Sequence, residues 1–260
     1  MATGAPGAGV QLLPLTGWPD VQPGDDLATL VFESLARSGL ALAAGDVLVL
    51  AQKVVSKSEG RLVPLATVQP SSRALELAPQ VRKDARLVEL VLRESRRIVR
   101  TAPDVLIVED RHGFIMANAG IDQSNVQGNA AGDFALLLPE DPDASAQRLR
   151  AALGARTGVL PGLLINDSFG RPWRLGTVGV AIGCAGVAAT LDLRGSADRY
   201  GRELKVTVVG HADEIAAAAS LVMGQAAEGT PCVLVRGLPA QGEAQPASAL
   251  LRTSAEDLFR

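Results

Sequence analysis

Two acidic segments of the chain contain side chains of the types that bind metal ions. Residues 120–125 include Asp122, and residues 166–171 include Asp167 followed by Ser168. A carboxylate beside a hydroxyl or an amide offers the hard oxygen ligands that magnesium and manganese prefer. If the two segments converge in space, they would form a site for a metal ion and a phosphate group. The alternative is that Asp, Asn, Ser and Gly simply build turns at both places.

The apolar residues before each segment indicate what positions it. Residues 163–165 form an apolar run bounded by Gly and Pro, which predicts a buried strand. Residues 114–117, before the first acidic segment, form a less regular apolar run. We therefore expect each acidic segment to be a turn at the end of a strand.

Basic side chains lie close to these elements. Lys53 and Lys57 follow an apolar run at residues 47–51, and Arg171 and Arg174 belong to or follow the second acidic segment. Such cations can neutralise phosphate oxygens. They can equally be the solvated ends of surface elements.

The common phosphate-binding sequences are missing. Residues 224–230 have the glycine spacing of a Walker A loop but no lysine before Thr230. No G-x-G-x-x-G follows a predicted strand and opens a helix. A nucleotide would therefore be held by a different set of loops.

Composition excludes several classes of function. The formal net charge of −3 and an aromatic content of 3% argue against binding nucleic acid through phosphate contacts or base stacking. Cys184 and Cys232 are the only cysteines, which favours reduced buried thiols in a cytoplasmic protein over a disulfide. With two histidines in the chain, an imidazole-rich zinc site is not expected.

Local patterns predict the elements that position these residues. Apolar runs predict strands at residues 10–15, 47–51, 163–165, 204–209 and 233–235, and a hairpin of residues 105–108 with 114–116. Helical spacing predicts helices after Asp25-Asp26 and at residues 71–78, 85–97, 144–153 and 212–223. Strands and helices do not alternate regularly, so we expect an α+β fold with mixed sheets and packed helices, not a Rossmann or P-loop fold.

The ends of the chain differ from the middle in composition. Residues 1–10 read as a disordered leader, and residues 239–260 as a loosely held C-terminal tail. The stretch between them, residues 11–238, is expected to be one domain, with two subdomains possible and a boundary near residues 139–142. The most apolar stretch, residues 178–189, is broken by Gly and is too short for a membrane span. We expect a protein without membrane association.

An ordered set of short motifs resembles one enzyme family. The motifs are Gly45–Leu50, Val55–Arg61, Asn118–Asn125, Leu138–Ser145, Asp167–Arg174, Tyr200–Leu204, Ala212–Ala217 and Val233–Gly237. In this order they are similar to the signatures of coenzyme F-420 γ-glutamyl ligases, from about Leu12 to Gly237. Each motif alone is weak, but the ordered set is specific.

This resemblance implies an activity and its partners. Members of the family join L-glutamate to the terminal lactyl carboxylate of F-420-0 and then extend a γ-linked glutamate tail. They use GTP and two divalent ions, Mg2+ or Mn2+, and form homodimers with an unusual α+β fold. A requirement for K+ stays open.

The resemblance also assigns roles to individual residues. Asp122 and Asp167 take the positions of metal ligands essential for catalysis, and Ser168 that of a ligand to a second metal. Gln225 stands where relatives can have an acidic ligand to that metal, and its neutral amide is weaker. The remaining nucleotide-contacting positions are occupied by Thr16, Gly17, Trp18, Pro19, Gln52, Lys53, Lys57, Asn125, Met223, Gly224 and Gly229. Gln52 and Lys53 replace smaller polar residues of relatives.

These residue types suit the implied chemistry. Transfer of the GTP γ-phosphoryl group to a carboxylate gives an acyl phosphate, which the glutamate amine can attack. Phosphoryl transfer needs positioning and charge neutralisation but no protein nucleophile. A carboxylate could take the amine proton, and Glu94 and Glu203 are candidates. Two alternatives remain: a ligase for another carboxylate acceptor, such as a folate-like molecule, or a metal-nucleotide binding module without turnover.

Overall fold

The computed structural model describes residues 9–124, 134–253 and 255–257. In these ranges the α-helices are α1 (Leu27–Arg37), α2 (Gln52–Ser58), α3 (Ser72–Val81), α4 (Ala85–Arg93), α5 (Pro142–Thr157) and α6 (His211–Met223). The strands are β1 (Gln11–Leu15), β2 (Val47–Ala51), β3 (Leu62–Pro64), β4 (Ser95–Ala102), β5 (Val105–Asp110), β6 (Ile115–Ala117), β7 (Phe134–Leu136), β8 (Gly162–Arg171), β9 (Arg174–Ala185), β10 (Leu191–Asp192), β11 (Val208–Val209) and β12 (Cys232–Arg236). None of the helices described is long and apolar enough to cross a bilayer.

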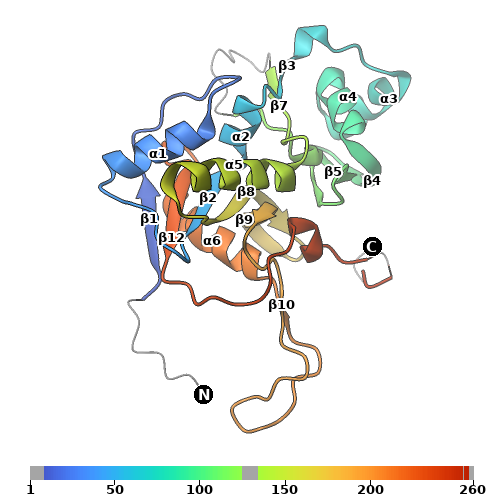
Figure 1. Ribbon diagram of the computed structural model, residues 1–260. Helices are drawn as coiled ribbons and strands as arrows, with labels where there is room; N and C mark the ends of the chain where they lie inside the picture. The colour runs from blue at the N-terminus through green and yellow to red at the C-terminus, as the bar shows by residue number, and fades with distance from the viewer. Residues whose placement is uncertain (1–8, 125–133, 254, 258–260) are drawn as a thin grey trace.

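A mixed five-stranded sheet forms the centre of the molecule (Figure 1). Its order is β1-β12-β2-β8-β9, with β2 and β8 parallel and the other neighbours antiparallel. Val49 on β2 lies between Val233 on β12 and Leu164 on β8, and all three side chains are fully buried. Strands buried on both faces read as continuous apolar runs, so the three predicted buried strands are confirmed. The predicted α+β fold, which is neither a Rossmann nor a P-loop fold, is also confirmed.

Helices α5 and α6 cover opposite faces of this sheet. Ile165 on β8 lines a small hollow together with Leu149 of α5, whereas the next residue, Asn166, donates its amide N–H to Ser220 of α6 at 3.1 Å. Consecutive residues of a strand point to opposite faces. The sheet is therefore the middle layer between two helical layers.

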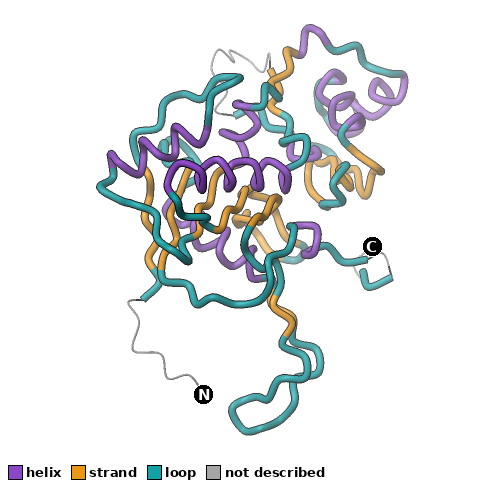
Figure 2. Tube along the Cα trace, in the orientation of Figure 1, coloured by secondary structure: helices purple, strands orange, loops and turns teal. Residues whose placement is uncertain are grey.

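A second region, formed by residues 62–124 and 134–137, has its own apolar core. Helices α3 and α4 pack on the antiparallel sheet β4-β5-β6, burying for example Leu77, Val88 and Leu106. The figures show this region beside the central sheet, at the upper right of the view (Figures 1 and 2). The chain enters it through β3 and leaves it through β7, and these strands pair antiparallel. The domain boundaries themselves stay a prediction.

Two helices differ in length from their predictions, for identifiable reasons. Asp141 accepts a hydrogen bond from the N–H of Ala144 at 3.0 Å, Pro142 is the first helical residue, and Gly158 ends α5 with a φ of 73°. Helix α5 is therefore longer than the predicted 144–153. Helix α4 is shorter than the predicted 85–97, because the chain from Ser95 onward pairs with β5.

One other predicted strand is shorter in the structure, and three further predicted elements are confirmed. The strand expected at residues 204–209 is limited to Val208–Val209, which pairs with β10. The predicted helices at 71–78 and 212–223 and the hairpin of β5 with β6 are confirmed.

The segment after Gly237 packs against the central layer, although its composition predicts a loose tail. Ala247 is fully buried, and its N–H donates to Oδ1 of Asp143 on α5 at 2.9 Å. The same oxygen accepts the N–H of Cys184 on β9 at 2.8 Å. One carboxylate thus joins α5, β9 and the C-terminal segment.

Candidate active site

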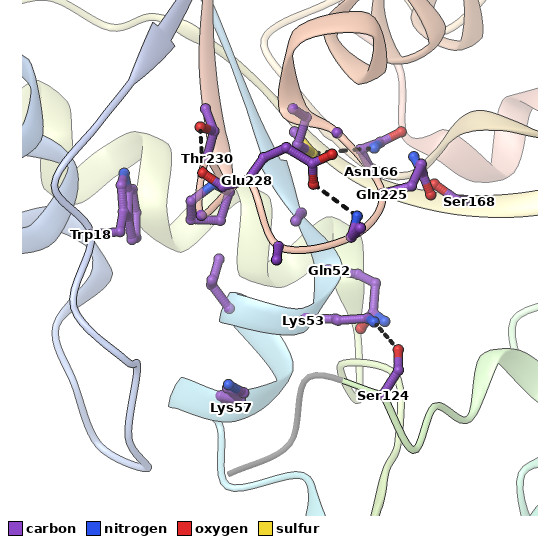
Figure 3. A pocket seen from close by; sticks show the side chains of 18 of the residues that line it. Trp18, Gln52, Lys53, Lys57, Ser124, Asn166, Ser168, Gln225, Glu228 and Thr230 are labelled. Carbon is purple, nitrogen blue, oxygen red and sulfur yellow. Dashed lines mark hydrogen bonds between the residues drawn. The ribbon is translucent and has the colours of Figure 1, made fainter.

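A cleft of about 660 Å³ lies between the segment after β1, the start of α2, the middle of β8 and the loop after α6 (Figure 3). The sequence-predicted residues that line it are Trp18, Pro19, Gln52, Lys53, Lys57, Asp122, Asp167, Ser168, Met223, Gly224, Gln225 and Gly229. Side chains from distant parts of the sequence therefore meet in one place, including both acidic segments.

Asp167 is carried by a strand and not by a turn. Strand β8 continues without interruption to Arg171 and pairs with β9 throughout, for example Asp167 with Val180 and Gly170 with Thr177. The prediction of a turn at residues 166–171 is wrong, because its polar residues are paired with a partner strand that lies later in the sequence. Asp167 consequently sits on the backbone of the central sheet.

Asp122 is positioned by a bent segment of the second region. It follows the 3-10 turn η2 (Asn118–Gly120), in which Asn118, Ala119 and Gly120 have φ values of 54°, 53° and 69°. Asp122 then exchanges backbone hydrogen bonds with Leu136, at 3.0 and 2.8 Å. A side chain at Gly120 would meet Leu138 at 2.7 Å, so this bend requires glycine there.

The two carboxyl groups have different pKa values. Burial is the main reason why the pKa of Asp167 is raised to about 6; the charge of Asp122 adds to it, while the N–H of Ser168 works against it. Burial also opposes ionisation of Asp122, but Lys53 and the N–H of Ser124 outweigh burial and lower the pKa of Asp122. Near neutral pH, both groups can supply anionic oxygens.

Each cleft lysine is paired with a carboxylate. Lys53 Nζ lies 2.5 Å from Asp122 Oδ2 and donates to Ser124 Oγ at 2.9 Å. Lys57 Nζ lies 3.0 Å from Asp20 Oδ1. Gln52 is buried and accepts a hydrogen bond from the hydroxyl of Ser56 at 2.9 Å within α2, so its side chain supports the helix.

The loop between α6 and β12 forms another wall of the cleft. Gly224 ends α6 with a φ of 76°, and Glu228 folds back so that its carboxylate accepts the N–H of Ala226 at 2.8 Å. A Cβ at Gly224 would lie 2.2 Å from the carboxyl carbon of Glu228. The loop thus needs a glycine at this end, and Gln225 and Glu228 both line the cleft.

The donor set fits a divalent ion that is shared with phosphate. The part of the chain that the structure describes has no cluster of three or more His, Cys, Asp or Glu side chains able to hold a metal alone. Mg2+ commonly binds through one or two carboxylates, with waters and substrate phosphates completing its shell. Asp122 and Asp167, with the hydroxyl of Ser168, provide such a partial set.

Two buried polar atoms in cleft-lining residues also lack a partner. They are the indole N–H of Trp18 and the amide oxygen of Asn166, neither of which is hydrogen bonded within the described ranges. Both atoms are enclosed by protein; the amide oxygen of Asn166, for example, lies 2.6 Å from the position that a Cβ on Gly179 would take.

Several predicted residues lie elsewhere. Thr16 and Gly17 do not line the cleft: the carbonyl of Thr16 accepts the hydroxyl of Ser34 at 2.6 Å, and Gly17 packs against Arg37. Arg171 and Arg174 are at the tip of the β8–β9 hairpin and do not line the cleft. Asn125 lies outside the described residues.

The candidate bases and the thiols are also away from the cleft. Glu94 pairs with Arg61 and Arg111, at 3.1 and 3.4 Å, and neither it nor Glu203 lines the cleft. Burial raises the pKa of the Cys184 thiol to about 12 and also raises that of Cys232. Thiolate chemistry is therefore not supported.

Sequence reasoning did not assign two cleft-lining acids, Asp20 and Glu228. Asp20 directly follows the predicted nucleotide segment, and Glu228 lies inside the glycine-spaced loop. Their position beside predicted nucleotide-contacting residues was the only signal in the sequence that they could line the cleft. Their direction into the cleft depends on loop geometry, which sequence patterns do not specify.

Comparison with known proteins decides the family. The model of the F-420-0:γ-glutamyl ligase family matches residues 17–237. The chain belongs to this family. It is 49% identical to the coenzyme F-420:L-glutamate ligase of Methanopyrus kandleri, covering 92% of this chain and 93% of that protein. The ligases of Methanothermobacter thermautotrophicus and Archaeoglobus fulgidus are 45% and 43% identical, covering 97% and 96% of this chain and 99% and 96% of theirs.

The family match spans the whole cleft. All of the residues that line it, from Trp18 to Pro231, fall within the matched residues 17–237. The F-420-0:γ-glutamyl ligase family is thus matched over the whole cleft and over the apolar core of the second region.

Proposed function

We propose that this protein is a GTP- and divalent-metal-dependent ligase that joins L-glutamate to the carboxylate of F-420-0 and then extends a γ-linked glutamate tail. The observation that carries the proposal is the cleft in which Asp122 and Asp167, the two lysines and the glycine-containing loop face one another. Family membership and the names of the similar ligases support the identity of the acceptor and the amino acid.

The proposed reaction has two steps. The acceptor carboxylate oxygen attacks the γ-phosphorus of GTP, so that GDP leaves and an acyl phosphate forms. The glutamate nitrogen then attacks the acyl carbon, the amide bond forms, and inorganic phosphate leaves with the former carboxylate oxygen. The amine loses its proton in this step. No protein nucleophile is required, which agrees with the buried, protonated state of both thiols.

The chain's own residues would act through charge and position. Asp122, Asp167 and Ser168 would hold one or two Mg2+ or Mn2+ ions, which neutralise the phosphate charge when bound. Lys57 would offer its ammonium group to phosphate oxygens in exchange for Asp20. Trp18 and the loop at residues 224–229 would enclose the nucleotide, since both line the same cleft.

Homodimer formation and a cytoplasmic location are part of this proposal. Both come from the family resemblance, and two buried thiols suit a reducing compartment. Gel filtration coupled to light scattering tests the dimer directly.

A mass spectrum tests the activity. F-420-0 is incubated with the protein, L-glutamate, GTP and Mn2+, and a gain of one glutamate residue per acceptor is expected, followed by larger multiples. Asp167→Asn, checked for folding, serves as the inactive control. A folded protein that adds no glutamate to F-420-0 contradicts the proposal, and glutamate added to a folate-like acceptor instead would reassign the substrate.

A further inference from the structure

We infer that Lys53 is a built-in counter-cation for Asp122, which nucleotide phosphates draw away, so that a divalent ion binds well only when the nucleotide is present. The inference rests on the proposed function, because it concerns the same cleft. It gives Lys53 a role in positioning Asp122, in addition to its proposed contact with phosphate.

The geometry shows that both oxygens of Asp122 are engaged. Oδ2 is 2.5 Å from Lys53 Nζ, and Oδ1 accepts the N–H of Ser124 at 2.7 Å. The ammonium group of Lys53 also donates a hydrogen bond to the hydroxyl of Ser124, at 2.9 Å. Figure 3 shows Lys53 reaching from α2 toward Ser124 on the opposite wall. The carboxylate is thus satisfied without any metal.

A divalent ion and this ammonium group would compete. Both are cations that need Oδ2 of Asp122, and two cations on one carboxylate repel each other. The amide N–H of Ser124 leaves Oδ1 with reduced capacity to serve as the sole ligand. Without nucleotide, the metal must displace Lys53.

Phosphate removes this competition. A lysine carries three donors on a flexible stem, and the side chain of Lys53 is 27% exposed, so it can exchange Asp122 for phosphate oxygens in the same cleft. The freed Oδ2 then becomes available to a metal that the phosphates also bind. Since coupling between two ligands is reciprocal, nucleotide and metal should raise each other's affinity by the same factor.

Lys57 provides a matched control. It lines the same cleft, four residues later on the same helix, but its partner is Asp20 at 3.0 Å and not a predicted metal ligand. Removing its charge changes the field of the cleft without freeing Asp122. An effect specific to Lys53 therefore separates direct competition from general electrostatics.

The test measures Mn2+ affinity by electron paramagnetic resonance of free Mn2+, with and without a non-hydrolysable GTP analogue. The proteins are wild type, Lys53→Met, Lys53→Arg and Lys57→Met. Without the analogue, Lys53→Met is expected to bind Mn2+ about tenfold more tightly than wild type, a scale typical for altered groups around metal ligands. The analogue should then increase Mn2+ affinity less in Lys53→Met than in wild type. Lys53→Arg and Lys57→Met should stay within about twofold of wild type without the analogue.

Folding is followed by circular dichroism in the same samples. A larger increase in Tm on adding Mn2+ to Lys53→Met than to wild type gives a second readout that needs no catalysis. If Lys53→Met does not fold, Lys53→Gln replaces it, because its amide can still donate to Asp122 without a positive charge.

Mn2+ affinity of Lys53→Met that is no tighter than wild type, including no binding by either, overturns the inference. So does equal tightening by Lys57→Met or Lys53→Arg. If the Mn2+ affinities change as expected but no glutamate is added to F-420-0, the proposed function fails and the role of Lys53 stands.

Discussion

The two acids of the cleft are supported by two regions built in different ways. Asp167 belongs to the long strand β8, which is paired on both sides at its buried start and with β9 along its whole length. Asp122 belongs to the second region and follows three consecutive residues with positive φ. One acid is placed by the pairing of a long sheet strand, and the other by a bend that glycine makes possible.

The electrostatic settings differ in the same way. Asp167 has no ion pair in the described structure, and burial raises its pKa to about 6, whereas Lys53 keeps Asp122 ionised. Environments that separate the pKa values of two nearby acids commonly give them separate tasks. The charge of Asp122 is already balanced by Lys53, whereas, among the described residues, that of Asp167 is not. A metal ion that binds both carboxylates would therefore supply the missing positive charge.

The largest expected effect is loss of turnover when either acid is neutralised. Asp122→Asn and Asp167→Asn should each lower the rate of glutamate addition by more than about a hundredfold, the scale for removing one preorganised electrostatic contact to a transition state. Asp104→Asn is the control, since Asp104 is exposed in the second region and pairs only weakly, at 3.8 Å, with Arg82. Near-normal turnover in either cleft variant would remove that acid from the site.

The pH dependence of stability should distinguish the two acids next. The folded pKa of Asp167 is above the ordinary value of 3.8, so the folded state binds the extra proton between about pH 4 and 6. The metal-free protein should therefore lose stability as pH rises through this window, by on the order of 2 kcal/mol.

Urea unfolding at pH 4.5 and pH 7 measures this change. Asp167→Asn should remove most of the difference between the two pH values. Asp122, whose folded pKa is lowered, contributes with the opposite sign: its stabilisation is lost as pH falls below its ordinary value. A pH dependence that persists unchanged in Asp167→Asn would contradict the raised pKa.

A pair of glycine substitutions tests the supports directly. Gly120→Ala should cost about 1–3 kcal/mol of unfolding free energy, because Gly120 has positive φ and a Cβ there would meet Leu138. Gly170→Ala, in the strand that carries Asp167, should be close to neutral, since nothing lies within 4 Å of its Cβ position. Thermal unfolding and Mn2+ affinity are measured for both. Equal effects would mean that the two supports are equally tolerant.

The smallest effect is expected at the cysteines. Cys184→Ala and Cys232→Ala should leave turnover essentially intact, because both thiols are buried and protonated. Each variant should lose stability through packing, and Cys184→Ala also loses the hydrogen bond that the thiol donates to the carbonyl of Val187 at 3.4 Å. Loss of turnover in a stably folded variant would reveal a thiol role.

Residue patterns predicted the central sheet better than the second region. Strands β2, β8 and β12 are buried on both faces, so their apolar runs are unambiguous. In contrast, residues 95–97 continue a helical pattern but pair with β5, a tertiary contact that local spacing does not contain. The same limitation applies to residues 166–171, whose polar composition suggests a turn although β9 holds them in a strand.

The candidate site shows the same contrast between what local sequence patterns predict and what tertiary contacts decide. The ordered motifs brought most cleft residues together, including Asp122 and Asp167 from distant segments. Thr16 and Gly17 were assigned by position in a motif, yet their neighbours Ser34 and Arg37 of α1 hold them outside the cleft. Lys53 was assigned to the nucleotide, whereas its pairing with Asp122 depends on how the second region meets α2.

The carboxylate of Asp143 has a consequence for protein engineering. Its Oδ1 receives N–H groups from both Cys184 and Ala247, so this one carboxylate attaches both the outer strand β9 and the C-terminal segment to α5. Shortening the chain to Gly237 would remove one of these donors and uncover the apolar surface beneath Ala247. Because Leu250 and Leu251 also pack against the core, C-terminal affinity tags and fusion partners should be attached after these residues, with the bond from Ala247 to Asp143 left in place.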